Sequence, residues 1–114
     1  MAVFLTSGCS MRAIFHLCLH FIVPLWIARR FYATNWLVTF FVLVATMVID
    51  VDHFLADPIY DPNRCGLGFH PLHSFPAIGV YGLMLIHQVT RTIGVGLWIH
   101  IILDGLDCVA INMP

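Results

Sequence analysis

Histidine and aspartate residues recur at helical spacing in four separate parts of this chain. They are His16 and His20, then Asp50, Asp52 and His53, then His70 and His73, and finally His100, Asp104 and Asp107. Residues three or four apart lie on one face of a helix, so each part can offer several side chains to one point. Imidazole and carboxylate groups together are typical ligands of zinc, manganese or iron. The spacing therefore predicts metal chemistry.

The number of these residues exceeds what one ion requires. A single zinc ion takes three or four protein ligands, and helical bundles supply them as inward-facing pairs from several helices. We therefore expect two divalent ions bridged by a carboxylate, with zinc as the first choice and manganese or iron as alternatives. The predicted ligands are His16, His20, Asp50, His53, His70, His73, His100 and Asp104.

Further residues outside this ligand set are predicted to take part in catalysis. Asp52 and Asp107 are expected either to orient a ligating histidine or to act as general base. Arg64, together with Arg12, is expected to neutralise a phosphate, because a guanidinium matches its oxygens. The sequence contains no serine or cysteine nucleophile with an evident base beside it.

The composition indicates an integral-membrane protein. Of 114 residues, 61% are hydrophobic and 10% are charged, and the mean hydropathy is +0.94. These values are outside the range of soluble globular domains. A net charge of −1 excludes a basic nucleic-acid surface. The length corresponds to a single domain over residues 1–114, and residues 1–10 are expected to form a short extension.

Four apolar segments must position the polar residues. We expect helices over residues 13–29, 35–55, 74–90 and 93–111, with a turn-rich loop over 57–68 that leads to His70 and His73. The predicted fold is an all-α bundle of four transmembrane helices. Threaded up and down, these helices bring all four polar parts to one membrane side. His87 falls at the opposite side and is interpreted as an interfacial residue.

The arginines give a weak indication of orientation. Arg29, Arg30 and Arg91 lie at the end away from the histidines and aspartates. Arg12 and Arg64 lie at the end that carries them. The positive-inside tendency therefore favours a site on the non-cytoplasmic side. Cys65 and Cys108 lie near the predicted site, and their pairing as a disulfide remains open.

These motifs resemble two groups of proteins. From residue 11 onward, the chain is similar to a family of short bacterial four-helix membrane proteins described as a domain of unknown function. More loosely, the motifs resemble those of LexA-binding, inner-membrane-associated metal-dependent hydrolases. That second resemblance matches Asp50, Asp52, His73, His100 and Asp104, but Leu72 stands where that family has threonine. Together the resemblances imply a bacterial inner-membrane protein with hydrolase chemistry.

The sequence therefore predicts an integral-membrane metal-dependent hydrolase that acts on a phosphoester or a lipid head group. One alternative is a membrane di-iron oxidase or hydroxylase of acyl chains, which the histidine pairs faintly favour. Another is a non-enzymatic protein that binds or transports a metal or a proton. The expected partners are the lipid bilayer and a lipid or phosphoester substrate. Four short helices bury little surface, which is compatible with a homodimer.

Overall fold

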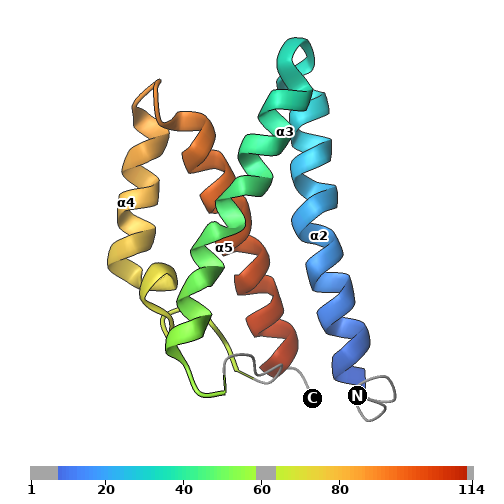
Figure 1. Cartoon of the computed structure of the whole chain (residues 1–114), viewed down its shortest axis with the longest axis vertical. Helices are drawn as coiled ribbons and strands as arrows, with labels where there is room; N and C mark the ends of the chain where they lie inside the picture. Colours follow the sequence, from blue (N-terminus) through green and yellow to red (C-terminus); the bar gives the residue numbers. More distant parts are fainter. Residues whose placement is uncertain (1–7, 59–63, 113–114) are drawn as a thin grey trace.

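In a computed structural model, which describes residues 8–58 and 64–112, the fold is all-helical, with turns and loops between the helices and no strand among these residues. The elements are α2 (Gly8–Phe31), η1 (Ala33–Asn35), α3 (Trp36–Ala45), η2 (Thr46–Leu55), η3 (Pro71–His73), α4 (Phe75–Ile86) and α5 (Arg91–Asn112). Successive long segments run in alternating directions, so that the end of η2, the loop before α4 and the end of α5 meet at one end (Figure 1). This confirms the predicted up-and-down helical bundle.

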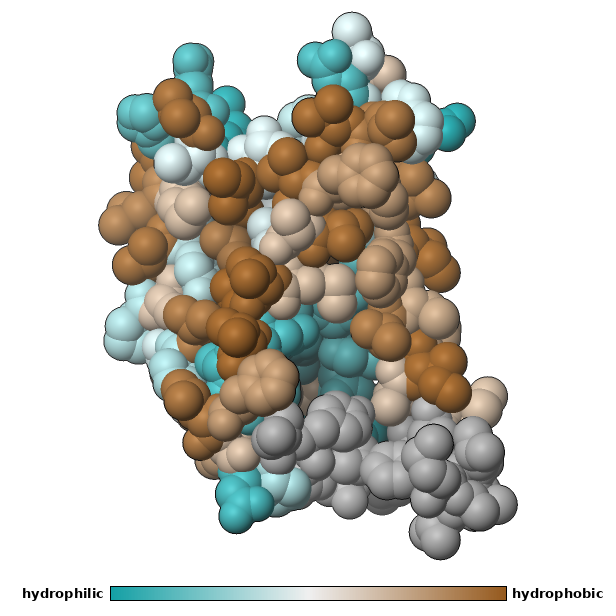
Figure 2. Space-filling view, viewed as in Figure 1, coloured by the Kyte–Doolittle hydropathy of each residue, from teal (hydrophilic) through white to brown (hydrophobic). Residues whose placement is uncertain are grey.

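Within the described residues, three helical stretches are long and apolar enough to cross a membrane. They cover Met11–Phe31, Ala33–Leu55 and Arg91–Asn112. The fourth, α4, has 12 residues and rises only about 18 Å, well short of the roughly 30 Å of bilayer hydrocarbon. Hydrophobic side chains cover much of the visible outer surface between the two ends (Figure 2). The fourth predicted span is therefore a shorter apolar helix that packs along α5.

Some helix boundaries differ from the predicted ones. The helix predicted over 74–90 ends at Ile86, because the Thr90 hydroxyl and the Arg91 guanidinium bind the carbonyl oxygens of Met84 and Leu85. Residues 8–10 belong to α2, so the expected extension of residues 1–10 is wrong for these three residues. Its remainder, residues 1–7, lies outside the described residues.

The helix predicted over 35–55 changes its winding halfway along. It is α-helical to Ala45 and then a 3₁₀-helix of 10 residues to Leu55. The Thr46 hydroxyl donates to the Leu43 carbonyl oxygen at 2.6 Å, where the winding changes. A 3₁₀ run this long is uncommon and often marks a functional segment.

The 3₁₀ winding sorts the side chains of η2 into three rows, because residues three apart are eclipsed. One row is buried (Thr46, Ile49, Asp52), one is half-buried (Met47, Asp50, His53) and one is exposed (Val48, Val51, Phe54). Asp50 and Asp52 consequently point in different directions, although only one residue separates them.

Gly96 allows α5 to approach the junction of α3 and η2 closely. A Cβ atom at Gly96 would lie 2.6 Å from Thr46 Cγ2 and 3.1 Å from Leu43 Cα. Any larger residue would therefore push the two elements apart. Since His100 follows one turn later on α5, this contact brings His100 within reach of η2.

Candidate metal centre

Four donor atoms from three parts of the chain meet at one point. His73 Nε2 lies 3.0 Å from Asp104 Oδ2, 3.3 Å from Asp50 Oδ1 and 3.2 Å from His100 Nε2. His100 Nε2 lies 3.1 Å from Asp50 Oδ1 and 3.2 Å from Asp104 Oδ2. A tetrahedron with metal–ligand bonds of about 2.0 Å has edges of about 3.3 Å, so these separations match the spacing of zinc ligands. We call these four residues the tetrahedral group.

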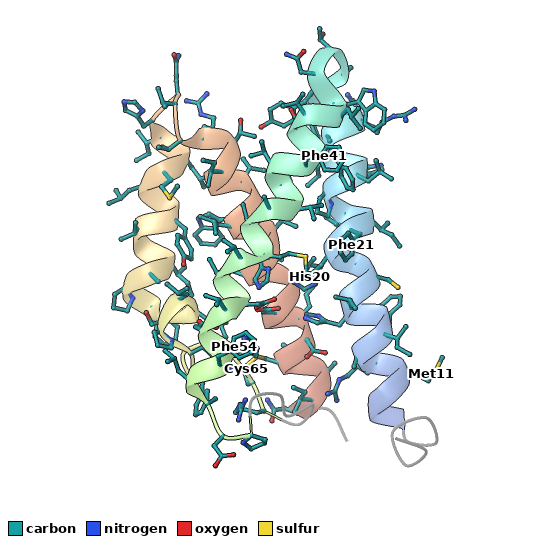
Figure 3. The ribbon with its side chains drawn as sticks, in the orientation of Figure 1. Met11, His20, Phe21, Phe41, Phe54 and Cys65 are labelled. Carbon is teal, nitrogen blue, oxygen red and sulfur yellow. A yellow bond between two sulfur atoms is a disulfide. The ribbon has the colours of Figure 1, made fainter. Side chains whose placement is uncertain are left out.

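A second group shares Asp104 with the first. The other carboxylate oxygen, Asp104 Oδ1, lies 3.1 Å from His16 Nε2 and 3.4 Å from His20 Nε2. His16 and His20 on α2 therefore converge with Asp104 on α5. Figure 3 shows His20 in the region between α2 and η2. A carboxylate with one oxygen in each group has the arrangement of a ligand that could bridge two ions.

The positions of two imidazole protons follow from the backbone and carboxylate contacts. His20 Nδ1 lies 2.9 Å from the His16 carbonyl oxygen, which can only accept, so this nitrogen donates. His73 Nδ1 lies 2.9 Å from Asp52 Oδ2 and donates in the same way. In a neutral imidazole the Nε2 atom then carries a lone pair. Both Nε2 lone pairs therefore point at carboxylate oxygens of the two groups.

Asp52 is buried behind His73 rather than among the converging atoms. Its Oδ2 atom accepts from the backbone N–H of Leu72 at 2.9 Å as well as from His73. A carboxylate that receives the second N–H of a ligating histidine fixes the ring orientation and strengthens the ligand. Of the two roles predicted for Asp52, this position favours the orienting role.

His53 and His70 lie beside Asp52 and form a third group with it. His53 Nδ1 lies 3.1 Å from Asp52 Oδ1 and 3.0 Å from the Asp50 carbonyl oxygen. The His53 and His70 rings stack with their centroids 4.0 Å apart. These two predicted ligands are therefore next to the tetrahedral group but are not members of it.

Burial and charge act in opposite directions on the two loop histidines. Burial lowers the pKa of His70, and the neighbouring His53 adds to this effect. Burial would also lower the pKa of His73, but its contacts with Asp104, Asp50 and Asp52 outweigh burial and raise the pKa to about 10. The carboxylates around His73 thus favour positive charge at this point of the protein.

Several contacts hold the segment that carries His70 and His73. The Tyr81 hydroxyl, on α4, donates to the Leu72 carbonyl oxygen at 2.7 Å. Ser74 caps α4 by accepting from the Ala77 N–H. Sequence reasoning missed Tyr81, because a tyrosine in an apolar helix gives no sign of which carbonyl its hydroxyl reaches.

Cys65 and Cys108 form a disulfide, the pairing that the sequence left open. Cys65 lies in the loop before His70, and Cys108 lies one turn beyond Asp104 on α5. The bond therefore fastens the loop that carries two histidines to the helix that carries His100 and Asp104.

The remaining predicted site residues lie around the two groups. Asp107 Oδ1 pairs with Arg12 Nε at 3.2 Å and joins α5 to α2. Arg64 donates to the Pro58 carbonyl oxygen and lies over the Phe69 ring, contacts that keep it in the loop. His87 lies in the turn after α4, at the far end of the bundle, as expected.

Comparison with known proteins gives a family without an assigned activity. No curated protein and no solved structure matches the chain. A family model described as "Family of unknown function (DUF6122)" matches residues 10–111. The three groups of candidate metal ligands among the described residues lie entirely within this range. The chain therefore belongs to this family of unknown function.

Proposed function

We propose that this protein is an integral-membrane hydrolase that uses two divalent metal ions to cleave a phosphoester. The observation that supports the proposal most is the convergence of Asp50, His73, His100 and Asp104. Their donor atoms lie 3.0 to 3.3 Å apart in the five pairs measured above. These separations are those of ligands around one small cation.

A divalent ion fits this arrangement better than protons do. Protonation of both His73 and His100 would neutralise two carboxylates, but it would place two Nε2–H groups 3.2 Å apart. Two imidazolium groups at that distance repel each other. A single cation between the four atoms carries the same charge and contacts every lone pair. In the second group a metal ion also fits better than protons, because His20 Nε2 is buried and has no hydrogen-bond partner among the described residues.

Two bound ions would supply an activated water and would stabilise the leaving oxygen, which is the arrangement suited to phosphoester cleavage. Asp104 would hold both ions at a fixed separation, and Asp52 would keep the His73 ring in place. The mixture of two imidazoles and two carboxylates suits zinc or manganese. Iron in the same position would instead support the oxidase alternative.

Metal analysis and an activity assay test the proposal together. The protein is purified in detergent, its metals are counted by mass spectrometry, and hydrolysis of bis(4-nitrophenyl) phosphate is followed. We expect about two zinc or manganese ions per chain, and hydrolysis that stops on chelation and returns when the metal is restored. Absence of bound metal in the presence of excess zinc would overturn the proposal. Bound iron with oxygen consumption would replace it by the oxidase.

We further propose that the metal centre faces the non-cytoplasmic side. Arg29, Arg30 and Arg91 lie at the opposite end of the bundle, which agrees with the positive-inside tendency. The Cys65–Cys108 disulfide lies at the end with the metal centre. Disulfides persist in oxidising compartments and are rare in the cytosol. These two observations are independent and favour the same orientation.

Cysteine labelling in intact cells tests this orientation. In a Cys9→Ser/Cys18→Ser background, Asn112→Cys lies at the metal end and Thr34→Cys at the opposite end, and both positions are exposed. We expect an impermeant maleimide to label Asn112→Cys in intact cells and Thr34→Cys only after permeabilisation. The reverse pattern would show that the centre faces the cytoplasm.

A further inference from the structure

Within the two groups that share Asp104, Asp50 and His16 have the most exposed side chains. The Asp50 side chain is 39% exposed and that of His16 is 25% exposed. By contrast, His73, His100 and His20 are at most 4% exposed. Asp50 belongs to η2 and His16 to the N-terminal half of α2. The centre is therefore closed by α5 and the loop but open between these two helices.

The surface around this opening is apolar. In η2, the exposed row of Val48, Val51 and Phe54 runs directly beside the row that contains Asp50. On α2, Phe15 is exposed beside His16. Figure 2 shows hydrophilic atoms at the bottom of a hollow in the lower half of the molecule, with hydrophobic side chains on both sides. The opening thus faces sideways, where the lipid chains of a bilayer would lie.

The depth of the opening limits what can reach it from the side. Asp50 lies five residues inside the end of its span at Leu55, which corresponds to about 10 Å of 3₁₀-helix. His16 lies five residues inside the described span that begins at Met11, or about 8 Å of α-helix. A molecule that enters here must pass between apolar side chains at the depth of the outer part of the hydrocarbon. Such a molecule has to be amphiphilic.

The charge of the centre selects the polar part of that molecule. Three carboxylates, Asp50, Asp52 and Asp104, offset three of the four positive charges that two divalent ions carry. Arg12 and Asp107 neutralise each other. The loaded centre keeps a net positive charge, which favours an anionic head group.

From these observations we infer that the substrate is a membrane amphiphile with a phosphate head group, which enters sideways from the bilayer between η2 and the N-terminal half of α2. The inference rests on the proposed hydrolase function and adds the route and the substrate class. For a phosphomonoester, water adds to phosphorus and the bond between phosphorus and the amphiphile's oxygen breaks. Inorganic phosphate is released with the oxygen and one hydrogen of the water, and the alcohol takes the other hydrogen and stays in the bilayer.

A matched pair of tryptophan variants tests the route. Met47 lies one 3₁₀ turn before Asp50 in the same half-buried row, whereas Val80 is exposed on α4, which does not line the opening. We expect Met47→Trp to narrow the opening and to lower hydrolysis of dioleoyl phosphatidic acid in phosphatidylcholine vesicles at least tenfold. The Val80→Trp variant should change it less than twofold. Both variants should bind as much metal as wild type. Equal rates in the two variants would refute the sideways route.

A measurement that needs no turnover separates this inference from the proposed function. Phosphatidic acid with a photoreactive group in its acyl chain is cross-linked to the metal-loaded protein, and the labelled peptides are identified. We expect labelling of η2 and of residues 11–20 that excess phosphatidic acid competes away and that Met47→Trp reduces. Labelling that is equally strong on α4 and insensitive to competition would overturn the inference. If this labelling is specific but no phosphoester is hydrolysed, the hydrolase assignment fails and the binding route stands.

Discussion

The Asp104→Ala variant is expected to bind neither of the two metal ions proposed for the wild-type protein. Among the described residues, Asp104 alone belongs to both groups, with Oδ2 directed at His73 and His100 and Oδ1 directed at His16 and His20. Its removal takes a ligand from each ion and leaves buried imidazoles without their counter-charge. We expect metal content, measured by mass spectrometry after desalting, to fall from about two ions per chain to fewer than about 0.2, with complete loss of hydrolysis.

Single-group variants distinguish a bridging carboxylate from a general loss of structure. His100→Ala should lose the ion of the tetrahedral group and keep the other, and His16→Ala should do the opposite. Asp107→Ala is the matched control, because this carboxylate lies one turn further along α5 and pairs with Arg12 outside both groups. It should retain both ions. If Asp104→Ala still binds two ions, or if all four variants lose metal equally, the bridging assignment is wrong.

The Asp52→Asn variant is expected to bind metal more weakly without losing the site. Asp52 contacts none of the four donor atoms of the tetrahedral group. It accepts hydrogen bonds from His73 Nδ1 and from the Leu72 N–H. An amide in its place carries no charge and accepts with one oxygen only, so His73 loses basicity and a fixed orientation. Loss of such a supporting carboxylate typically costs about 10- to 100-fold in metal affinity. Titration with a zinc-sensitive chelator measures the change, and full occupancy should return at high zinc.

Asp57→Asn is the control for this variant, since Asp57 is exposed and follows the end of η2. Its metal affinity should equal that of wild type. Two results would contradict the orienting role of Asp52. Unchanged affinity would mean that the His73 hydrogen bond does not matter, and loss of an ion even at saturating zinc would mean that Asp52 is itself a ligand.

The fold class and the position of the site could be predicted from the sequence. Apolar runs of about twenty residues can satisfy their backbone groups in a membrane only as helices, so the segments around Phe21, Phe41 and Ile99 left little choice of structure. Alternating directions then follow from the short connections between the helices. Polar residues at the ends of successive helices must meet at the same membrane face, which is why His20, Asp50 and His100 could be grouped without coordinates.

The partners of each side chain depended on contacts that the sequence does not encode locally. The change from α to 3₁₀ winding at Thr46 turns Asp52 toward His73 and leaves Asp50 in the tetrahedral group. An α-helix would have rotated the two carboxylates differently, since its residues advance by 100° rather than 120°. The length of α4 was likewise set by the capping of its last carbonyls by Thr90 and Arg91.

Sequence alone thus determined a helical membrane protein with imidazoles and carboxylates gathered at one end, because hydrophobicity and helical periodicity are properties of each segment by itself. Tertiary structure decided that Asp104 faces two groups, that Asp52 supports His73, and that the centre opens between η2 and α2. These features depend on the rotation and separation of neighbouring helices. Both are fixed by contacts between residues far apart in the chain, such as Gly96 against Thr46 and Cys65 with Cys108.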